Sequence, residues 1–494
     1  MKTILFIIAF ISIVNAQPEI SSIKPDQDHN VGLVSKQFEA PTDSIAPDTS
    51  GMGTLTSVEL TQKMMPGWNL SNSLEALPNE TSWGNPLTTQ RLMDSIKAAG
   101  FKSIRLPVAW YRTTDTSIYI ISATWLNRVE EVVNYALNTG MYVIINEHWD
   151  YGWQQPTYED SAYVNNRLAT MWEQIAIHFR DYGDHLLFAG LNEVAVTNDW
   201  GLPTPERAAV ENSFCQTFVN AVRSTGGRNF YRYLLVQGYR TDINATVASF
   251  VIPTDVVPNR LIIEDHYYDP YNFTLNSTSN IIEWGMYATD PSRTETWANE
   301  SWADGQFQKL KIKYVDQGYG VVIGEYGALA RPNLVGTDLA IYEAYRKYYM
   351  QYITRSMERH SLVPMYWEGS LFNRSTGAHI NQDILDAIID TSTVEPVVGV
   401  RESLPIPKSF LLEQNYPNPF NPSTLIGYQL PISSFVNLTV YDALGKEIKT
   451  LVNKYQNAGK YFVQFNASDL PSGVYFYRLD AGTFHTTKKL LLLK

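Results

Sequence analysis

The chain has 494 residues, enough for one large domain and a smaller one. With 44% hydrophobic and 18% charged residues, its composition is typical of a globular protein. Its 38 basic residues are outnumbered by 50 acidic ones, and the net charge of −12 would repel a phosphate backbone, so we expect no nucleic-acid partner.

The first 53 residues predict an export signal followed by a leader. Lys2 precedes an apolar run from Ile4 to Val14, and Ala16 ends a small-residue cleavage site, so residues 1–16 predict a signal peptide. Residues 17–53 are rich in Ser, Pro, Asp and Thr and have no sustained period, which predicts a flexible leader. Since no later stretch reaches the ~18 consecutive apolar residues of a spanning helix, we expect no transmembrane segment in the mature chain.

Between residues 54 and 390, short apolar segments alternate with amphipathic ones. The apolar segments begin at Pro66, Ser103, Tyr142, Leu186, Tyr233, Leu261, Gly320 and Leu362. Helical periods lie between them, over 87–99, 125–137, 162–179, 207–222, 306–315 and 342–357, with room for only a short helix over 243–250. Apolar strands that are each followed by a helix are typical of a covered parallel sheet. The pattern predicts an α/β fold, a (β/α)₈ TIM barrel over residues 54–390.

Polar and aromatic side chains follow these strands at the ends that meet at the barrel mouth. They are Arg105, His148, Asn192, Glu193, His266, Tyr268, Glu325 and Trp367. Two of them, Glu193 and Glu325, are carboxylates at the ends of buried strands, and paired carboxylates are the requirement of glycoside hydrolysis. A structural ion pair is the alternative.

A general acid must keep its proton, whereas a nucleophile must be ionised and needs a cation or hydrogen-bond donors beside it. Arg105 and Tyr268 are candidate donors for the second role. Hydrolysis by two carboxylates needs no cofactor, and the sequence has neither an HExxH pair for a metal nor a glycine motif for a nucleotide. We therefore expect neither cofactor nor metal.

The motifs along the barrel also carry a family resemblance. GWNLSNSLEA (67–76), WGNP (83–86), RLPVAW (105–110), NEHWD (146–150), LNE (191–193), HYY (266–268), GEYG (324–327) and the strand of Trp367 resemble glycoside hydrolase family 5, in particular its cellulase-type endoglucanases. The resemblance implies a retaining mechanism, with Glu193 as general acid/base and Glu325 as nucleophile. It further implies that Arg105 and Tyr268 hold Glu325, that Asn192 holds the sugar 2-hydroxyl, that His148 and His266 line the reacting subsite, and that Trp367 is its stacking platform.

The expected function is thus that of a secreted endo-β-1,4-glucanase acting on a β-glycan. Mannan, xyloglucan or xylan could replace cellulose as substrate, since that choice depends on loops. A catalytically silent glycan-binding protein is the alternative from a different class. Loop aromatics could add sugar subsites, although packing is the more common role of each. These aromatics are Trp110, Trp149, Trp153, Trp200 and Trp284.

After Asp390 the composition changes. Residues 391–403 predict a linker, and short alternating strands over 404–494 predict a small all-β sandwich. NYPNPFNPST (415–424), VYDALGKEIKTLV (440–452), LPSGVYFYRL (470–479) and the final KKLLLLK resemble the sorting domain read by the type IX secretion machinery of gram-negative bacteria. That resemblance implies a secreted or surface-associated protein. A carbohydrate-binding or fibronectin-like module is the alternative.

Overall fold

The computed structural model describes residues 44–493, apart from 111–113, 116–117, 149–151, 198, 200, 368–370, 391–393, 395–396, 398–406, 408 and 457. The expected signal peptide, most of the expected leader and most of the expected linker lie outside the described residues. The chain divides into two compact units, and the main stretch of the second begins at residue 397, inside the predicted linker. No helix in the described ranges is both long and apolar enough to cross a membrane.

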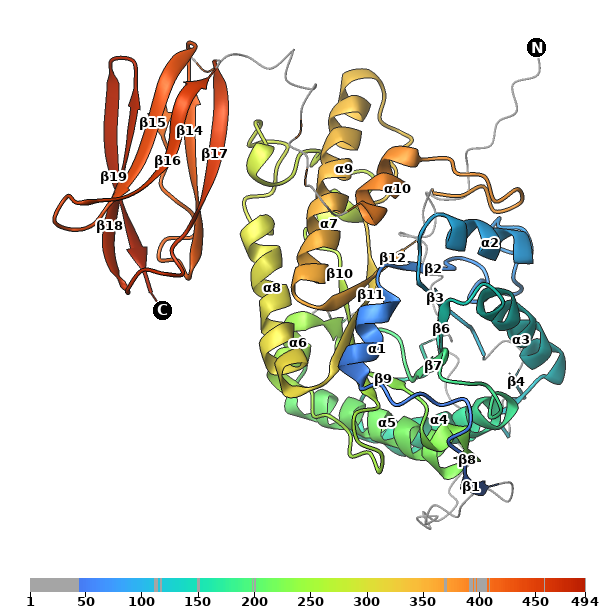
Figure 1. The fold of residues 1–494 in the computed structure, drawn as a ribbon. Helices are drawn as coiled ribbons and strands as arrows, with labels where there is room; N and C mark the ends of the chain where they lie inside the picture. The colour runs from blue at the N-terminus through green and yellow to red at the C-terminus, as the bar shows by residue number, and fades with distance from the viewer. Residues whose placement is uncertain are drawn as a thin grey trace, which may run out of the picture. The chain divides into compact units, whose positions relative to one another are not determined.

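The first unit is a closed barrel of eight parallel strands (Figure 1). The strands are β2 (Gly67–Asn69), β3 (Ser103–Leu106), β6 (Tyr142–Asn146), β7 (Leu186–Ala189), β9 (Leu234–Asp242), β10 (Leu261–Tyr267), β11 (Gly320–Tyr326) and β12 (Leu362–Trp367). They follow one another around the barrel in chain order, and β12 pairs with β2 to close it. The predicted (β/α)₈ barrel is confirmed.

Helices surround the barrel in the order that the alternating pattern predicts (Figure 1). They are α2 (Gln90–Ala98), α3 (Ala123–Leu137), α4 (Tyr158–His178), α5 (Pro205–Ser224), α6 (Ile243–Ser249), α7 (Tyr271–Thr274), α8 (Glu300–Lys313), α9 (Gly336–Arg359) and α10 (Gln382–Ile389). The connection after the fifth strand is the expected short helix, α6. The sequence did not predict α1, which precedes the first strand, the four-residue α7, which follows β10, or α10, which follows the last strand.

Helix α1 (Ser57–Met64) closes the N-terminal end of the barrel. It begins with a capping box, in which the Thr56 side chain accepts from the Glu59 backbone N–H and Glu59 accepts in return. Leu60 and Met64 pack in one apolar cluster with residues of the barrel strands. The members are Ile144, Leu187, Ala189, Leu235, Ile262, Val322, Val363 and Met365, with Tyr233 beside them. Apolar side chains of the described residues therefore fill this end of the barrel.

Residues 44–53 differ from the flexible leader that their composition predicts. Strand β1 (Ile45–Pro47) pairs in parallel with β8 (Gly226–Gly227), and the Gly53 backbone N–H donates to Asp184 at 3.0 Å. Gly226 has φ of +67°, and a Cβ there would lie 1.7 Å from the Ile45 carbonyl oxygen. Glycine at 226 thus allows the approach of a segment whose own sequence has no strand pattern.

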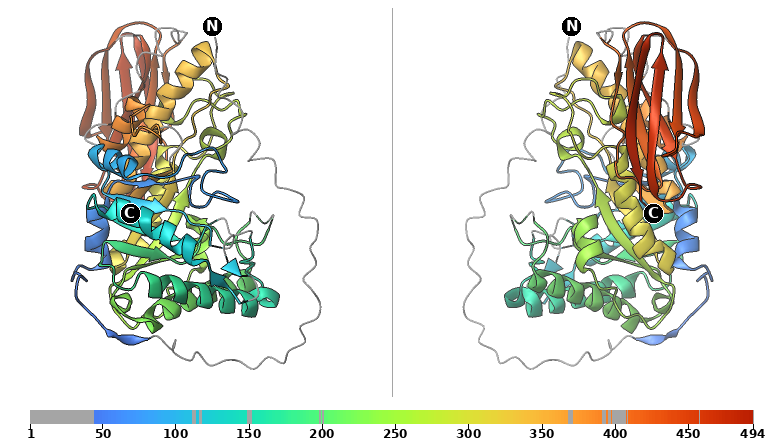
Figure 2. Two further views of the ribbon diagram at one scale, coloured as in Figure 1. Left: turned by 90° about the vertical axis from the view of Figure 1, so that its right-hand side faces the viewer. Right: turned by 90° about the vertical axis from the view of Figure 1, so that its left-hand side faces the viewer.

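The second unit is all-β, as expected, with two antiparallel sheets (Figure 2). One sheet joins β13 (Leu411–Leu412), β14 (Ser423–Leu430) and β17 (Gly459–Asn466). The other has the order β16 (Glu447–Gln456), β15 (Ser434–Tyr441), β18 (Gly473–Ala481) and β19 (Phe484–Leu492). Ile426 and Phe465 from the first sheet share one apolar core with Leu438, Leu479 and Leu490 from the second, which is the packing of a sandwich.

Candidate active site

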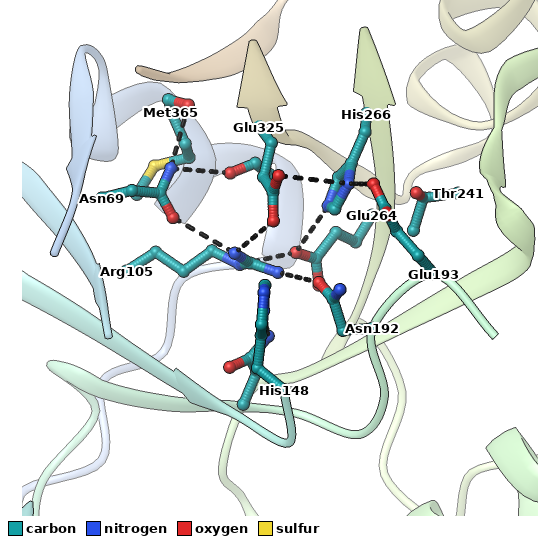
Figure 3. Close-up of polar contacts among 12 residues, drawn as sticks. Asn69, Arg105, His148, Asn192, Glu193, Thr241, Glu264, His266, Glu325 and Met365 are labelled. Carbon is teal, nitrogen blue, oxygen red and sulfur yellow. Dashed lines mark hydrogen bonds and ion pairs between the residues drawn. The ribbon is translucent and has the colours of Figure 1, made fainter. Parts of the chain in front are cut away.

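Four strand ends bring charged side chains together at the C-terminal mouth of the barrel (Figure 3). Arg105 lies on β3, His266 on β10 and Glu325 on β11, while Glu193 follows β7. Their atoms come within contact distance although they span 220 residues of sequence. The predicted convergence on a single mouth is what the barrel produces.

Arg105 is the centre of the cluster and is fully buried. Its Nη1 donates to Glu325 Oε1 at 3.0 Å and to Asn69 Oδ1 at 3.1 Å, and its Nη2 donates to Asn192 Oδ1 at 2.7 Å. Asn69 is fixed in turn, because its amide donates to the Gly324 carbonyl at 2.9 Å and to the Met365 carbonyl at 3.1 Å. The planar guanidinium thereby holds Glu325 and Asn192 in a defined orientation.

Glu325 has two donors, one on each carboxylate oxygen. Besides Arg105 on Oε1, the Tyr268 hydroxyl donates to Oε2 at 3.1 Å, and His266 Nδ1 lies 3.8 Å from the same oxygen. Burial and the neighbouring carboxylates keep the pKa of Tyr268 well above its ordinary value, so this hydroxyl remains a donor. These donors favour the ionised form of Glu325 and oppose the effect of its burial.

Glu193 is more open to solvent and is held by one partner. Its side chain is 48% exposed, against 8% for Glu325, and His266 Nδ1 lies 2.7 Å from its Oε1. The backbone of Glu193 has φ of +45°, a left-handed conformation that is uncommon for residues with a side chain. Such backbone strain is often found where a side chain is aimed for function.

His148 and Trp367 form the aromatic part of the mouth. Their rings are stacked, with centroids 5.7 Å apart and planes at 15°. Burial, with the charges of Arg105 and His266, lowers the pKa of His148 well below its ordinary value, so the ring is neutral. Trp367 is half-buried and also borders a small pocket. The pocket is lined by Tyr268, Leu275, Gly327, Ala328, Leu329, Tyr366 and Trp367.

The two carboxyl groups titrate as a pair that shares His266. Burial alone would lower the pKa of His266, but Glu325, Glu193 and Glu264 outweigh it and raise that pKa to about 10. Burial raises the pKa of Glu325 against the opposing effect of His266 and Arg105. Burial is also the largest single influence on Glu193, but the hydrogen bond and charge of His266, together with the charges of Arg105 and Arg240, outweigh it and lower the pKa. In the free protein, a proton shared by the two carboxyl groups thus favours the more buried Glu325. Because the groups interact strongly, the apparent pKa values describe the pair and not either residue alone.

Glu193, His266 and Glu325 each offer one ligand atom, and these atoms lie within 4.8 Å of one another. Among the described residues this is the group of side chains whose geometry could hold a metal ion. However, a histidine protonated at both ring nitrogens has no free lone pair, and the guanidinium of Arg105 would repel a cation. The charges of the cluster therefore disfavour a cation at this site.

Two polar residues in contact with the cluster were not predicted from the sequence. Asn69 ends β2, and Glu264 lies on β10 with its Oε1 2.9 Å from Arg105 Nε. Glu264 could have been found, because alternate residues of a strand face the same side and Glu264 precedes His266 by two. Asn69 gave no comparable signal, since its strand has only three residues.

The loop aromatics divide into packing residues and residues outside the described ranges. Trp110 is fully buried and donates to the Asn146 carbonyl at 3.0 Å, and Trp284 is 2% exposed and donates to the Ala298 carbonyl at 2.8 Å. The guanidinium of Arg167 lies 4.1 Å from the ring centroid of Trp153. Trp149 and Trp200 lie outside the described residues. The additional-subsite hypothesis is wrong for Trp110 and Trp284, because a sugar could not reach their rings.

Comparison with known proteins agrees with this geometry. Residues 68–373 match the family described as Cellulase (glycosyl hydrolase family 5). The chain belongs to glycoside hydrolase family 5. Residues 414–493 match the secretion system C-terminal sorting domain, which identifies the sandwich as a sorting domain and the protein as secreted or surface-associated.

Relatives of this family 5 chain extend over most of its length. A xyloglucan-specific endo-β-1,4-glucanase of Bacteroides ovatus is 40% identical over 74% of this chain and 76% of its own, and Endoglucanase A of Paenibacillus barcinonensis is 37% identical over 70% and 92%. Among solved structures, the B. ovatus xyloglucanase with a XXXG heptasaccharide has a TM-score of 0.69 at 40% identity, covering 72% of this chain and 80% of that one. A broad-specificity endoglucanase of Bacteroides salanitronis has a TM-score of 0.64 at 37% identity, covering 74% and 99%.

Proposed function

We propose that the protein is an endo-β-1,4-glucanase that cleaves internal bonds of a β-glucan with retention of configuration. The observation that carries the mechanism is the closeness of the two carboxyl groups, whose nearest oxygens lie within 4.8 Å. Retaining glycosidases keep their carboxyls about 5–5.5 Å apart, whereas inverting ones leave about 6.5–9.5 Å for a water. The separation of Glu193 and Glu325 is on the side of the closer, retaining arrangement and supports retention.

In the proposed reaction, Glu193 protonates the leaving glycosidic oxygen while Glu325 attacks the anomeric carbon, giving a covalent glycosyl-enzyme. Water then attacks that carbon, Glu193 takes its proton, and Glu325 is released. Arg105 and Tyr268 stabilise the Glu325 carboxylate before attack and after release, which their distances of 3.0 and 3.1 Å support. Asn192 accepts from Arg105 through its oxygen, so its NH₂ group is left to donate to a sugar hydroxyl.

Substrate binding supplies the proton arrangement that this division of labour requires. In the free protein the pKa of Glu193 is lowered, mainly by His266 acting against burial, and that of Glu325 is raised by burial. A bound glycan covers the side chain of Glu193, which is otherwise 48% exposed, and removes water from its carboxylate. The proton of the pair then moves to Glu193, and Glu325 stays ionised between Arg105 and Tyr268.

NMR of the first product tests the mechanism through its anomeric configuration. A β-configured reducing end is expected at early times, before mutarotation. An α-configured product would contradict the assignment of Glu325 as nucleophile.

A substrate panel tests the activity. We expect purified protein to release reducing ends from soluble β-1,4-glucan and from xyloglucan, which shares that backbone, faster than from mannan or xylan. Relatives named both endoglucanase and xyloglucan-specific endo-β-1,4-glucanase support this order. Release from mannan alone or xylan alone would contradict the glucanase proposal, and release from none would favour a silent glycan-binding protein.

We further propose that the sandwich is read by the type IX machinery of a gram-negative host and that residues 1–16 direct passage across the inner membrane. All the proposed site residues precede Asp390, so a chain ending there should keep its activity on soluble glycan. In a type IX host the shortened chain should accumulate in the periplasm. The converse experiment fuses residues 404–494 to an inert periplasmic reporter. A reporter that stays in the periplasm and binds insoluble polysaccharide would establish an accessory binding module instead.

A further inference from the structure

Glu264 is a buried carboxylate that the reaction described above does not use. It is 1% exposed and faces the barrel interior from β10, on the same side as His266 (Figure 3). Its Oε1 lies 2.9 Å from Arg105 Nε and 3.7 Å from His266 Nε2. One carboxylate oxygen is thus placed between the two cations whose other nitrogens face Glu325 and Glu193.

The neighbouring strand leaves room for this carboxylate. A Cβ at Gly324 on β11 would lie 2.2 Å from Glu264 Oε1, so any other residue there would push the carboxylate away from the cations. A buried carboxylate is costly unless it is paired. Although burial raises the pKa of Glu264, Arg105 and His266 outweigh it, and the pKa stays below its ordinary value. Glu264 is therefore a permanent negative charge.

The charges of the cluster decide whether it can hold a proton. Arg105 and protonated His266 are two positive charges, and ionised Glu193, Glu325 and Glu264 are three negative ones. Together they leave an excess of one negative charge, which one proton neutralises. Without the charge of Glu264, the two cations would balance two fully ionised carboxylates, and nothing would favour a proton on them.

The remaining groups around the cluster do not change this balance. Burial raises the pKa of Asp265 well above its ordinary value, so this carboxyl is neutral, and it accepts from Thr246 at 2.6 Å on the outer side of β10. His148 and Tyr268 are neutral, as described above. Arg240 on β9 also lowers the pKa of Glu193, but its contribution is weaker than those of His266 and Arg105. Its side chain is half-buried, so solvent screens its charge.

We propose that Glu264 is a positioning residue whose negative charge lets the Glu193–Glu325 pair keep one proton at working pH. It acts through Arg105 and His266 and does not touch the substrate. The inference rests on the proposed function, because the proton concerned is the one that Glu193 gives to the leaving oxygen.

The test compares the pH dependence of kcat/KM on soluble β-glucan for the full chain and for E264Q, whose amide has the same shape without the charge. The basic limb of this profile, where kcat/KM falls at high pH, reports loss of the acid's proton from the free enzyme. It should move to lower pH by about one unit in E264Q, since a lost negative neighbour weakens proton binding. E264D keeps the charge and should return the limb most of the way to the wild-type position. D265N alters the next, equally buried carboxyl, which faces away from the cations, and should leave the limb unchanged.

A second readout separates lost acid function from general damage. E264Q should lose more activity on natural glucan than on an aryl β-glycoside with an activated leaving group, which needs little protonation. An unmoved basic limb in E264Q, an equal shift in E264D, or an equal shift in D265N would each overturn the inference. If E264Q does not fold, the pH profile of E264D is the test. A shift of its basic limb by about one unit or more would overturn the inference, because the negative charge is still present. Inactive wild-type protein would instead refute the proposed function.

Discussion

The two ends of the barrel are built by the same strands but have opposite chemistry. On β10, Ile262 lies in the apolar cluster that α1 closes, while Glu264 and His266 lie roughly 7 and 13 Å further along the strand, in the charged cluster of the mouth. On β11, Val322 and Glu325 are divided in the same way. The N-terminal end contributes burial of apolar surface, whereas the mouth holds buried charges that are costly even when paired.

Stability and chemistry thus depend on separate lengths of each strand. Close packing below fixes the strands, and their ends above can then hold carboxylates whose electrostatics suit a reaction. Changes at the mouth should therefore alter turnover far more than folding, and changes at the closed end should do the reverse.

The largest expected effect is at the mouth, in E325Q. Loss of the nucleophile should reduce kcat by at least about 10³-fold on every substrate, because no covalent intermediate can form. Thermal unfolding followed by circular dichroism should show a Tm close to that of the wild type. If E325Q instead unfolds easily but its folded fraction keeps the wild-type kcat, Glu325 serves stability and not catalysis, which contradicts the proposed difference between the two ends.

The next largest effect is expected for E193Q, which distinguishes the acid role of Glu193 from the nucleophile role of Glu325. We expect a loss of about 10²–10⁴ in kcat/KM on natural glucan, because the leaving oxygen must depart unprotonated. On an aryl β-glycoside with an activated leaving group the bond-breaking step should be largely spared. Stopped-flow measurement of the aryl burst checks this, and equal losses on both substrates would contradict Glu193 as the acid.

At the closed end, I262A tests the opposite behaviour. Ile262 is fully buried in the α1 cluster, so truncation should lower the free energy of unfolding by about 2–5 kcal/mol. The matched control is I312A on α8, where the side chain is 56% exposed and the cost should stay within about 0.5 kcal/mol. Urea unfolding gives both values. kcat of I262A below its unfolding temperature should remain near wild type, and a large fall would show that the ends are coupled.

The effect expected to be least visible in activity assays is a pH-dependent contribution of His266 to stability. Its pKa is raised to about 10 because the surrounding carboxylates outweigh burial, against about 6.5 in an unfolded chain. Because the folded-state pKa is raised, protonated His266 contributes fully to the free energy of unfolding below pH ~6.5. This contribution is lost as the pH rises towards 10. The difference in unfolding free energy between wild type and H266Q should thus shrink over this window. A difference that grows with pH would mean that the folded protein holds His266 neutral.

Much of the barrel could be predicted because its signals are local. Strands such as VVIGEYGA over 321–328 are apolar and end in a polar residue, and a helix follows each one. Once eight such units are recognised, the closure of a barrel fixes which ends meet, so Arg105, Glu193 and Glu325 could be expected at one mouth. The short strands β1 and β8 could not, because two glycines and a three-residue segment have no pattern until they are packed.

The repeat of strands and helices, the polar side chains at the strand ends and the family motifs can all be read along the chain. The place of Glu264 between Arg105 and His266, the room that Gly324 leaves for it and the left-handed backbone of Glu193 become visible only in the folded barrel. Periodicity and turn chemistry act between neighbours in the chain, whereas the charge balance of the mouth depends on ångström-scale distances between strands. Those distances exist only when the barrel closes and places β3, β10 and β11 around one buried guanidinium.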